Sequence, residues 1–483
     1  MRNLLVISQA LRTALNHRPV RLGLLGTLCI AIGSLTPAYL PQVSPMWPVL
    51  RQIHLAGPAG RVIGTMVTIL GIVLLVHGWL SLRQERYIQI NPRAIVAVWS
   101  LPFLVCPPVF SHDMYSYGAQ GWMIHHGQNP YYGGPGLVPG PFSDYVSWVW
   151  RFTPAPYGPL GLQISRVIVE ISGGQPWLAA MLMRVPAILG VVAIVVLLPK
   201  IARRLNMNEA RVIWFACLNP LVIIDFVGGG HNDAWMMGLV VLGLWVAVHP
   251  RWWALGAVVI GLAAACKQPA IMAAVFLPLM TKKLESWRDI RRAGIAVGTS
   301  VVSVGISVGV FLVITWASGL GLGWISAMSV PGTVSSISPS FLVGRIAQWL
   351  VDPLGTSIVA WTSKIAMGVG AVLIIYFTLR YGPRQPIRAL SWSWLALALS
   401  VSALHSWYFL WGGLLYPMSS TAKSAERAGV LLVILMLFYA GLNHGERNGL
   451  HAGIAAIVCL GVWVLFALFY RQFKKRTGFM SPI

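Results

Sequence analysis

The chain has 483 residues, of which 57% are hydrophobic and only 10% are charged, and its mean hydropathy is +0.72. These charges are too few to cover a soluble surface of this size, so the composition predicts an all-α polytopic membrane protein. The formal net charge of +23 does not indicate a nucleic-acid-binding protein, because the basic residues punctuate hydrophobic stretches and do not gather on a polar domain.

Hydrophobic stretches that match a bilayer core of about 30 Å recur along the whole chain. No repeat of fixed period and no low-complexity linker divides it, so we expect a single membrane domain over residues 1–483 with about 14 transmembrane helices. The predicted spans lie near residues 22–40, 60–82, 93–110, 177–199, 211–228, 233–249, 252–266, 269–281, 293–317, 355–380, 389–403, 406–418, 427–443 and 449–470. The short spans 269–281 and 406–418 are predicted to be broken or tilted.

The distribution of Lys and Arg indicates which ends of these spans face the cytoplasm. If both termini are cytoplasmic, most basic residues fall in cytoplasmic segments, as the positive-inside rule requires. Outer and membrane positions then keep only Arg51, Arg61, Arg151, Arg166, Arg184, Lys267, Arg345, Lys364 and Arg447. The sequence therefore predicts a multi-pass cell-membrane protein with two long extracytoplasmic loops, 111–176 and 318–354. An active site is expected on that face, and no Walker-type nucleotide-binding loop occurs in the chain.

Asp113 opens the first long loop in the run SHDMYSYGAQGWMIHHGQNPYY. The chain has only 12 Asp and Glu, and a carboxylate at a membrane boundary is costly unless it pairs, binds or reacts. The structural alternative is a helix N-cap. The aromatic, amide and hydroxyl groups that follow suit sugar rings, although aromatic residues also form interfacial belts. We interpret Tyr115, Tyr117 and Gln120 as substrate-binding residues.

Further polar motifs follow at predicted outer helix ends. In TPAPYGPL, three prolines preorganise a turn beside Arg151, and residues 160–173 are predicted to be an interfacial helix. The motifs GGGHND, CKQPA and HSWYFLW come next. Helix capping is an alternative role for Asp233. Lys267 lies between two hydrophobic helices, where an unpaired charge is costly, so we expect it to have an anionic partner. The candidate substrate-binding residues in these motifs are Tyr157, His231, Asn232, Asp233, His405, Trp407 and Tyr408.

One isolated carboxylate, several cations and many aromatic residues on one side of a membrane indicate sugar transfer from a lipid-linked phosphate. An acceptor hydroxyl needs a base, for which Asp113 is the candidate, and a leaving phosphate needs cations, for which Lys267, Arg151 and Arg345 are the candidates. A single base is sufficient for transfer with inversion, whereas a retaining enzyme needs two nearby carboxylates. His125-His126 has no further ligand at metal-binding spacing, so we expect no metal and no cofactor.

The motifs named above, together with VPGTVSSISPS, occur in an order that resembles the polyprenol-phosphomannose-dependent alpha-1,6-mannosyltransferases of mycobacteria and corynebacteria (the MptA/MptB group). The similarity extends from about residue 90 to 440. It implies a membrane glycosyltransferase of the C-type fold that extends the mannan backbone of lipomannan and lipoarabinomannan. Its donor would be polyprenyl-phosphate-mannose and its acceptor a lipid-anchored mannan, in contact with membrane lipids and without nucleic acid. By analogy, Asp113 matches the catalytic Asp of the first large outer loop.

Two other functions stay open at this point. A transporter or flippase of a polyprenyl-linked glycan would also need many helices and intramembrane cations, but such folds often contain two related halves, which this sequence lacks. A glycosyltransferase of the same fold with another sugar or linkage would carry the same kinds of motif, because the pocket shape decides the sugar.

Overall fold

The computed structural model describes residues 2–83, 89–281, 284–330, 338–351 and 357–477, and it describes their side chains except in residues 2–5 and 469–477. Every regular element of this part of the chain is helical. Residues 331–337 of the motif VPGTVSSISPS, and with them part of the predicted loop 318–354, lie outside the described residues. The all-α prediction is confirmed for the residues that the structure describes.

Five segments of the described chain are long and apolar enough to cross a membrane. They are α4 (Pro58–Ser81), α10 with α11 (Pro176–Leu182 and Arg184–Arg204), α16 (Ile290–Ala317), α19 (Ser357–Tyr381) and α22 (Lys423–Arg447). Each has 24 or more residues, and about 20 are needed to cross a bilayer. These segments agree with the predicted spans 60–82, 177–199, 293–317, 355–380 and 427–443.

Several other predicted spans are broken helices. The π-helical segments η4 (Ile213–Cys217) and η5 (Val222–Gly228) meet at a bend of 52° and can be counted together, with α12 (Glu209–Val212), as a sixth span. The predicted breaks are also present. Residues 268–280 form η6 (Gln268–Met272), α15 (Ala273–Phe276) and η7 (Pro278–Met280), and residues 406–418 form η9 (Ser406–Tyr408), α21 (Phe409–Gly413) and η10 (Tyr416–Met418). Irregular backbone of this kind is tolerated at membrane depth where protein surrounds it.

The remaining helices are shorter or lie near the ends of the chain. They are α1 (Arg2–Leu15), α2 (Arg18–Gly33), α3 (Trp47–Gln52), α5 (Pro92–Ser100), η2 (Leu101–Leu104), α13 (Asp233–Ala247), α14 (Trp253–Cys266), α17 (Trp324–Ala327), α18 (Pro339–Val351), α20 (Pro386–Ser400) and α23 (Ala452–Thr477). The expected number of 14 membrane spans stays a prediction, because length and hydropathy identify five or six among the described residues.

Close contacts between α11 and α13 fix the helix that begins at Asp233. A Cβ atom on Gly190 of α11 would clash with the carbonyl group of Ala234, and one on Gly238 would clash with the backbone of Gly190. Small residues of this kind allow two helix backbones to approach closely in a membrane protein. The first turn of α13 is therefore held directly against α11.

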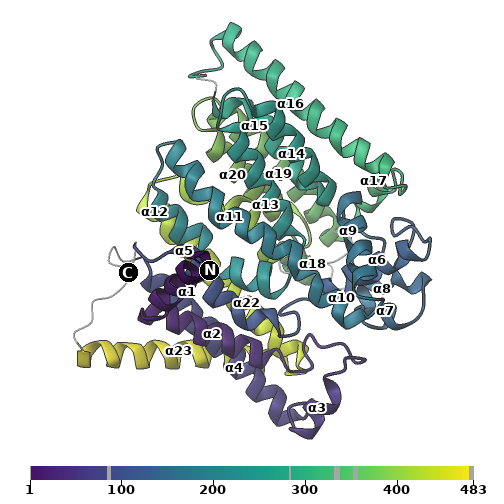
Figure 1. Cartoon of the computed structure of the whole chain (residues 1–483), viewed down its shortest axis with the longest axis vertical. Coiled ribbons are helices and arrows are strands. Elements are labelled where there is room, and N and C mark those ends of the chain that lie inside the picture. Colours follow the sequence, from purple (N-terminus) through teal and green to yellow (C-terminus); the bar gives the residue numbers. More distant parts are fainter. Residues whose placement is uncertain (1, 84–88, 282–283, 331–337, 352–356, 478–483) are drawn as a thin grey trace.

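Residues 113–171 form a group of short helices on one side of the molecule, at the right in Figure 1. The group contains α6 (Asp113–His125), η3 (Pro135–Leu137), α7 (Pro141–Asp144), α8 (Trp148–Arg151) and α9 (Pro159–Ile171). The 13 residues of α9 are too few to cross a bilayer core, in agreement with the prediction that residues 160–173 do not form a span.

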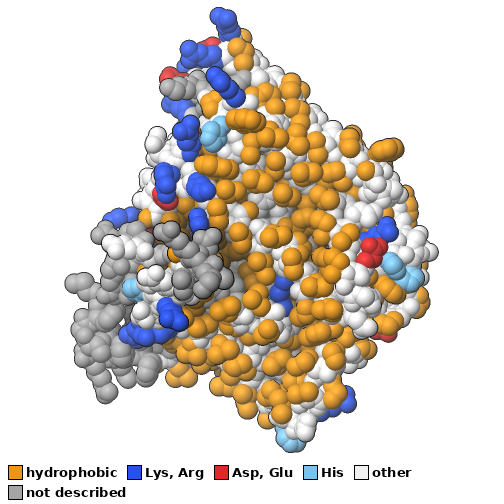
Figure 2. Space-filling view, viewed as in Figure 1, with side chains coloured by type: hydrophobic (Ala, Val, Ile, Leu, Met, Phe, Trp, Pro, Cys, Tyr) orange, Lys and Arg blue, Asp and Glu red, His pale blue; other side chains and the backbone are white. Residues whose placement is uncertain are grey.

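The surface in Figure 2 is dominated by hydrophobic side chains. Many hydrophobic side chains of the described chain are strongly exposed, Trp316 and Leu465 among them. Lys and Arg side chains gather along the edge of this face that lies away from the short helices α6–α9. A broad apolar face bordered by charge matches lipid contact, since lipid tails are as apolar as these side chains. The molecule is therefore a multi-pass membrane protein with a strong charge asymmetry.

Candidate active site

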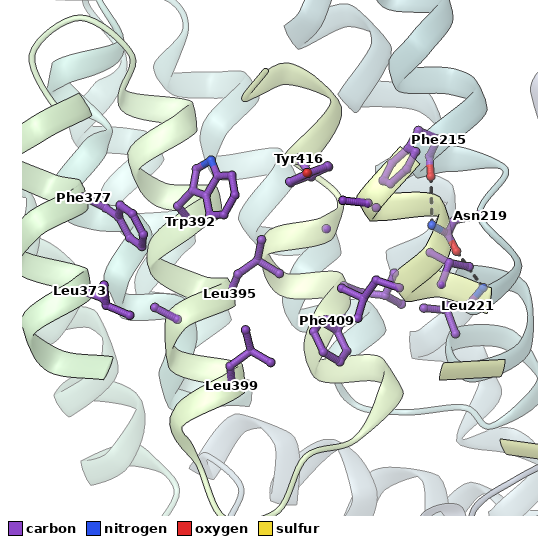
Figure 3. A pocket seen from close by; sticks show the side chains of 17 residues that line it. Phe215, Asn219, Leu221, Leu373, Phe377, Trp392, Leu395, Leu399, Phe409 and Tyr416 are labelled. Atoms are coloured by element: carbon purple, nitrogen blue, oxygen red, sulfur yellow. Dashed lines mark hydrogen bonds between the residues drawn. The ribbon is translucent and has the colours of Figure 1, made fainter. Parts of the chain in front are cut away.

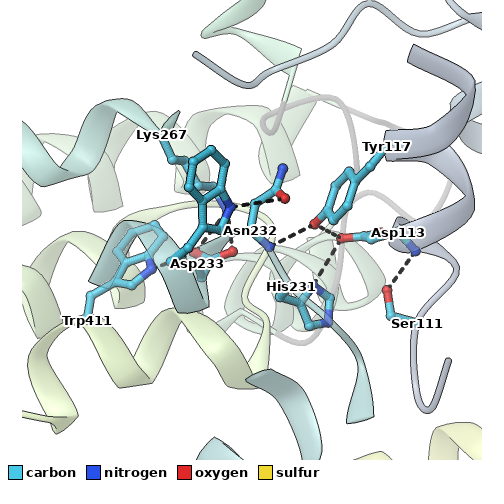
Figure 4. A network of polar contacts seen from close by, with 9 residues as sticks. Ser111, Asp113, Tyr117, His231, Asn232, Asp233, Lys267 and Trp411 are labelled. Atoms are coloured by element: carbon cyan, nitrogen blue, oxygen red, sulfur yellow. Dashed lines mark hydrogen bonds and ion pairs between the residues drawn. The ribbon is translucent and has the colours of Figure 1, made fainter. Parts of the chain in front are cut away.

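Asp113 is the first residue of α6, and its side chain is directed away from the backbone of that helix. His112, and not Asp113, occupies the N-cap position, and the backbone N–H of Asp113 donates to Oγ of Ser111 at 3.0 Å. The carboxylate oxygen Oδ2 accepts a hydrogen bond from the hydroxyl of Tyr117 at 3.3 Å and lies 3.3 Å from Nδ1 of His231 (Figure 4). The geometry favours a functional carboxylate over the capping alternative.

The surroundings of Asp113 keep its carboxyl ionised. Burial by itself would raise the pKa of this group, but the imidazole of His231 beside it, with Lys267 further away, holds the pKa below its usual range. Burial lowers the pKa of His405 to about 4, so that imidazole is neutral at neutral pH. The side chain of Asp113 is 17% exposed, which leaves an ionised carboxylate within reach of a ligand.

The segment Gly228–Gly230 places His231 and Asn232 beside α6. Gly230 adopts a φ of +60°, and a Cβ atom there would collide with the side chain of Met114, so only glycine fits this turn. The backbone N–H of Asn232 donates to the hydroxyl of Tyr117 at 3.4 Å. The hydroxyl of Tyr117 in α6 thus links the Asp113 carboxylate to Asn232 at the start of α13.

Asp233 forms the centre of a second, fully buried polar group. Its carboxylate accepts hydrogen bonds from Nζ of Lys267 at 2.8 and 3.0 Å and from Nε1 of Trp411 at 2.7 Å (Figure 4). Asn232 is the N-cap of α13, so helix capping does not explain Asp233. The anionic partner that the sequence required for Lys267 is Asp233, and the charges of the two buried groups compensate each other.

Aromatic rings connect the two carboxylate groups. Trp407 lies between His231 and His405, at centroid distances of 3.6 and 4.4 Å with nearly parallel planes. Nζ of Lys267 lies 4.7 Å from the ring centre of Tyr408 and 5.8 Å from that of Tyr157. Such ring faces, next to hydrogen-bonding edges, suit a sugar, which presents both C–H patches and hydroxyl groups.

The structure brings together most of the residues predicted for the site. The connected cluster contains Asp113, Tyr117, Tyr157, His231, Asn232, Asp233, Lys267, His405, Trp407 and Tyr408. Tyr115 instead contacts Tyr145 and Trp177, and its buried hydroxyl has no hydrogen-bond partner among the described residues. The buried Oε1 of Gln120 is likewise unpaired within that part of the chain.

The two predicted arginines have other contacts. Arg151 in α8 lies 3.6 Å from the carboxylate of Asp144, and Arg345 in α18 donates to Gln348 at 3.3 Å. Their proposed role at a donor phosphate stays a prediction.

Two residues near the site, Trp411 and Tyr39, have no site role in the predictions from sequence. Trp411 was visible as the last residue of HSWYFLW, and an indole N–H in an apolar segment needs an acceptor. Tyr39 lies 5.4 Å from the ring of His112, and its own ring faces Arg447 at 5.1 Å. Tyr39 had no sequence signal, because more than 70 residues separate it from Asp113.

An apolar cavity of about 330 Å³ lies between α19, α20, α21 and α22 (Figure 3). Its lining includes Phe409, which follows Tyr408 of the cluster directly, as well as Leu395, Leu399 and Gly413. The amide of Asn219 and the hydroxyl of Tyr416 also line it, but both make hydrogen bonds to the backbone at 2.8 to 3.0 Å. The cavity therefore offers a largely apolar surface that begins one residue from the polar cluster.

Metal binding has no obvious location in the described part of the chain. No group of three or more His, Cys, Asp or Glu residues gathers there at a spacing suited to a metal ion. The expectation of a metal-free site stays a prediction.

Residues 20–283 match the family described as "Alpha-(1->6)-mannopyranosyltransferase, N-terminal domain", and residues 172–406 match glycosyltransferase family 87. An alpha-(1->6)-mannopyranosyltransferase A of Mycobacterium tuberculosis is 29% identical over 484 residues, which cover 95% of this chain and 91% of that protein. The protein of the same name from Corynebacterium glutamicum is 28% identical, with 84% and 89% covered.

A probable alpha-(1->6)-mannopyranosyltransferase of Mycolicibacterium smegmatis is 29% identical and covers 97% of this chain. No solved structure matches the chain. The first family match includes Asp113, the glycine-rich turn and Lys267, and it spans more than half of the sequence. The chain therefore belongs to the alpha-(1->6)-mannopyranosyltransferase family.

Proposed function

We propose that this protein is a membrane mannosyltransferase that moves mannose from polyprenyl-phosphate-mannose to a lipid-anchored mannan acceptor. It forms alpha-1,6 linkages with inversion, in synthesis of the lipomannan and lipoarabinomannan backbone, on a glycosyltransferase fold of the C type. The observation that carries the proposal is the ionised, partly accessible Asp113 at the edge of a cluster of aromatic rings and hydrogen-bonding groups. The names of the related proteins supply the sugar and the linkage.

Asp113 acts as the general base in this mechanism. Its carboxylate accepts the proton of the acceptor hydroxyl as the oxygen attacks the anomeric carbon of mannose, and the bond from that carbon to the phosphate oxygen breaks with its electron pair on the phosphate. A single displacement inverts the anomeric centre. Tyr117 and His231 hold the carboxylate in place before the reaction.

Lys267 is the proposed contact for the leaving phosphate in the polar cluster. An ammonium group has three N–H donors, and Asp233 accepts two of them, which leaves one for a ligand oxygen. Because the charge of Lys267 is already compensated by Asp233, Arg151 and Arg345 are proposed as supplementary cations that reach the phosphate when the donor is bound. Fixed cations of this kind stabilise the charge that develops on the phosphate, and we propose that no divalent ion is required.

The apolar cavity supports a polyprenyl donor. A lipid chain needs a largely apolar surface, and the cavity between α19, α20, α21 and α22 has such a surface next to Tyr408. The accumulation of Lys and Arg away from α6–α9 supports a site on the extracytoplasmic face, with both termini in the cytoplasm.

The test is transfer by the purified, membrane-reconstituted protein. Polyprenyl-phosphate-mannose with a radiolabelled sugar is supplied together with a short alpha-1,6-linked mannan, and the linkage in the product is determined by methylation analysis. We expect labelled mannose in a new alpha-1,6 linkage. A product with another linkage, or movement of the intact donor across the membrane without transfer, would contradict the proposal.

A further inference from the structure

Arg184 is a buried cation that the mechanism above does not use. It begins α11, its side chain belongs to a residue that is 2% exposed, and it makes no ion pair with any acid among the described residues. A guanidinium group is expensive to bury in a membrane protein unless its donors are used. The contacts of this side chain therefore indicate what it is for.

The guanidinium contacts the two chain segments that lead into the site. Its Nη2 donates to the carbonyl oxygen of Gly228 at 3.2 Å and lies 4.0 Å from Sγ of Cys106. Its Nη1 lies 3.4 Å from Sδ of Met181, in the helix just before α11. Arg184 thus joins the start of α11 to the segment before Asp113 and to the segment before His231.

The carbonyl of Gly228 is the point where these segments meet. It accepts a second hydrogen bond from the backbone N–H of Val109 at 3.2 Å. A Cβ atom on Gly228 would collide with the side chain of Val109, so this side chain packs directly against Gly228. Val109 precedes Asp113 by four residues and Gly228 precedes His231 by three. The two segments continue to the Asp113 carboxylate and the His231 imidazole, which are 3.3 Å apart.

We propose that Arg184 is a positioning residue for the transfer reaction, which holds the Gly228 carbonyl against the Val109 segment so that His231 stays beside Asp113. This inference rests on the proposed function, because it assigns Asp113 and His231 to the reacting site. Arg184 itself does not touch the substrate in this arrangement. A charged donor to a carbonyl makes a stronger hydrogen bond than a neutral one, which suits a side chain that must fix two loops.

The test compares Arg184→Lys, Arg184→Met, His231→Phe and the double variant Arg184→Met/His231→Phe. The groups that act on Asp113 from neighbouring elements are His112, Tyr117, Tyr157, His231, His405, Tyr408 and Lys267. Of these, only the contact with His231 is expected to loosen. Asp113 then stays largely shielded from solvent but loses its stabilising neighbour, so its pKa rises and the acid limb of the profile of kcat/KM against pH moves to higher pH.

We expect Arg184→Met to lower kcat by about 10-fold to 100-fold, with donor KM nearly unchanged, and Arg184→Lys to recover part of the loss. The double variant should be no worse than His231→Phe, because both changes remove the same interaction. Arg166→Met is the matched control, since Arg166 is half exposed and pairs with Glu170. A normal pH profile in Arg184→Met, or additive losses in the double variant, would overturn the inference.

The variant Gly228→Ala tests the same contact at Gly228 instead of at Arg184. The added methyl group should separate Gly228 from Val109 and move the acid limb in the same direction. Hydrogen–deuterium exchange of residues 106–113 and 228–232, which needs no activity, should rise in both Arg184→Met and Gly228→Ala. Unchanged exchange in these segments contradicts the inference even if no transfer is measured, whereas an inactive wild-type protein contradicts the proposed function alone.

Discussion

Asp113 and Asp233 both lie in the first turn of a helix, but they differ in exposure and in their partners. Asp233 is fully buried, and its carboxylate is occupied by a lysine and an indole N–H. Asp113 is partly exposed, and its direct neighbours are a tyrosine hydroxyl and an imidazole. A carboxylate whose charge is compensated inside the protein stabilises the fold, whereas one that stays accessible is available for chemistry. The residues next to each aspartate in the sequence do not reveal this difference.

Asp113→Asn and Asp233→Asn should separate the two roles most clearly. Removing the base in Asp113→Asn should reduce transfer by about 10²-fold to 10⁴-fold, while thermal unfolding in detergent stays close to wild type. Asp289→Asn is the matched control, because Asp289 is about half exposed and forms an ion pair with Arg292, which has no role in the proposed mechanism. Near-normal turnover of Asp113→Asn would remove Asp113 from the mechanism.

The Asp233–Lys267 pair should show its effect in stability. Asp233→Asn leaves a buried ammonium group without its partner, and we expect a loss of about 3–5 kcal/mol in the free energy of unfolding. The double variant Asp233→Asn/Lys267→Met removes both charges and should recover much of that loss. If this folded double variant also shows a raised donor KM, Lys267 contributes to phosphate binding, and an unchanged donor KM would restrict Lys267 to a structural role.

His231→Phe should lower kcat by about 10-fold to 100-fold, at least as much as Arg184→Met, and it should also change the pH dependence. The phenyl ring keeps the stacking on Trp407 but removes the imidazole that holds the pKa of Asp113 below its usual range. Burial then raises that pKa, so kcat/KM should begin to fall at a higher pH on the acid side. His125→Phe, at an exposed position beside Glu170, is the control. An acid limb at its wild-type position would show that His231 does not tune Asp113.

The apolar cavity should affect only the lipid part of the donor. Gly413 lines the cavity, and a Cβ atom there would meet open space, so Gly413→Leu should fill the cavity without disturbing the backbone. We expect KM to rise several-fold for a long-chain polyprenyl donor and to stay unchanged for a short-chain donor. Gly368→Leu is the matched control on α19, at a similarly open position outside the cavity. Equal effects on both donors would contradict the assignment.

The smallest effect is expected from chelation. EDTA should leave the transfer rate of the wild-type protein unchanged, because fixed cations serve the leaving phosphate in the proposed mechanism. Loss of activity with EDTA, and recovery on addition of Mg²⁺ or Mn²⁺, would show that a divalent ion takes part.

Residues within one motif were more predictable than contacts between motifs. Asp113 and the aromatic run behind it stand out because polar residues are rare in a hydrophobic chain, and the breaks near 269–281 and 406–418 follow from short spans with proline. The partners of these residues depend on helix packing. Lys267 meets Asp233 across 34 residues only because α13 and α14 are adjacent, and Trp411 joins them from a separate broken helix.

Arg151 and Arg345 were selected only by their charge and their predicted side of the membrane. Among the described residues, their side chains contact Asp144 and Gln348, which lie outside the polar cluster. Arg184 was counted among the outer and membrane cations without a role, because its function depends on a carbonyl group that sequence does not locate. A basic residue is thus identified from sequence more easily than the group that it serves.

Because α11 and α13 approach each other closely, the position of Asp233 depends on the absence of a side chain at Gly190 in α11. One methyl group at Gly190 would push against the peptide that follows Asp233, although Gly190 belongs to no part of the polar cluster. Variants that change the aromatic rings to alter acceptor or donor preference should therefore keep Gly190. The spacing of α11 and α13 limits the space that is available to a new ring.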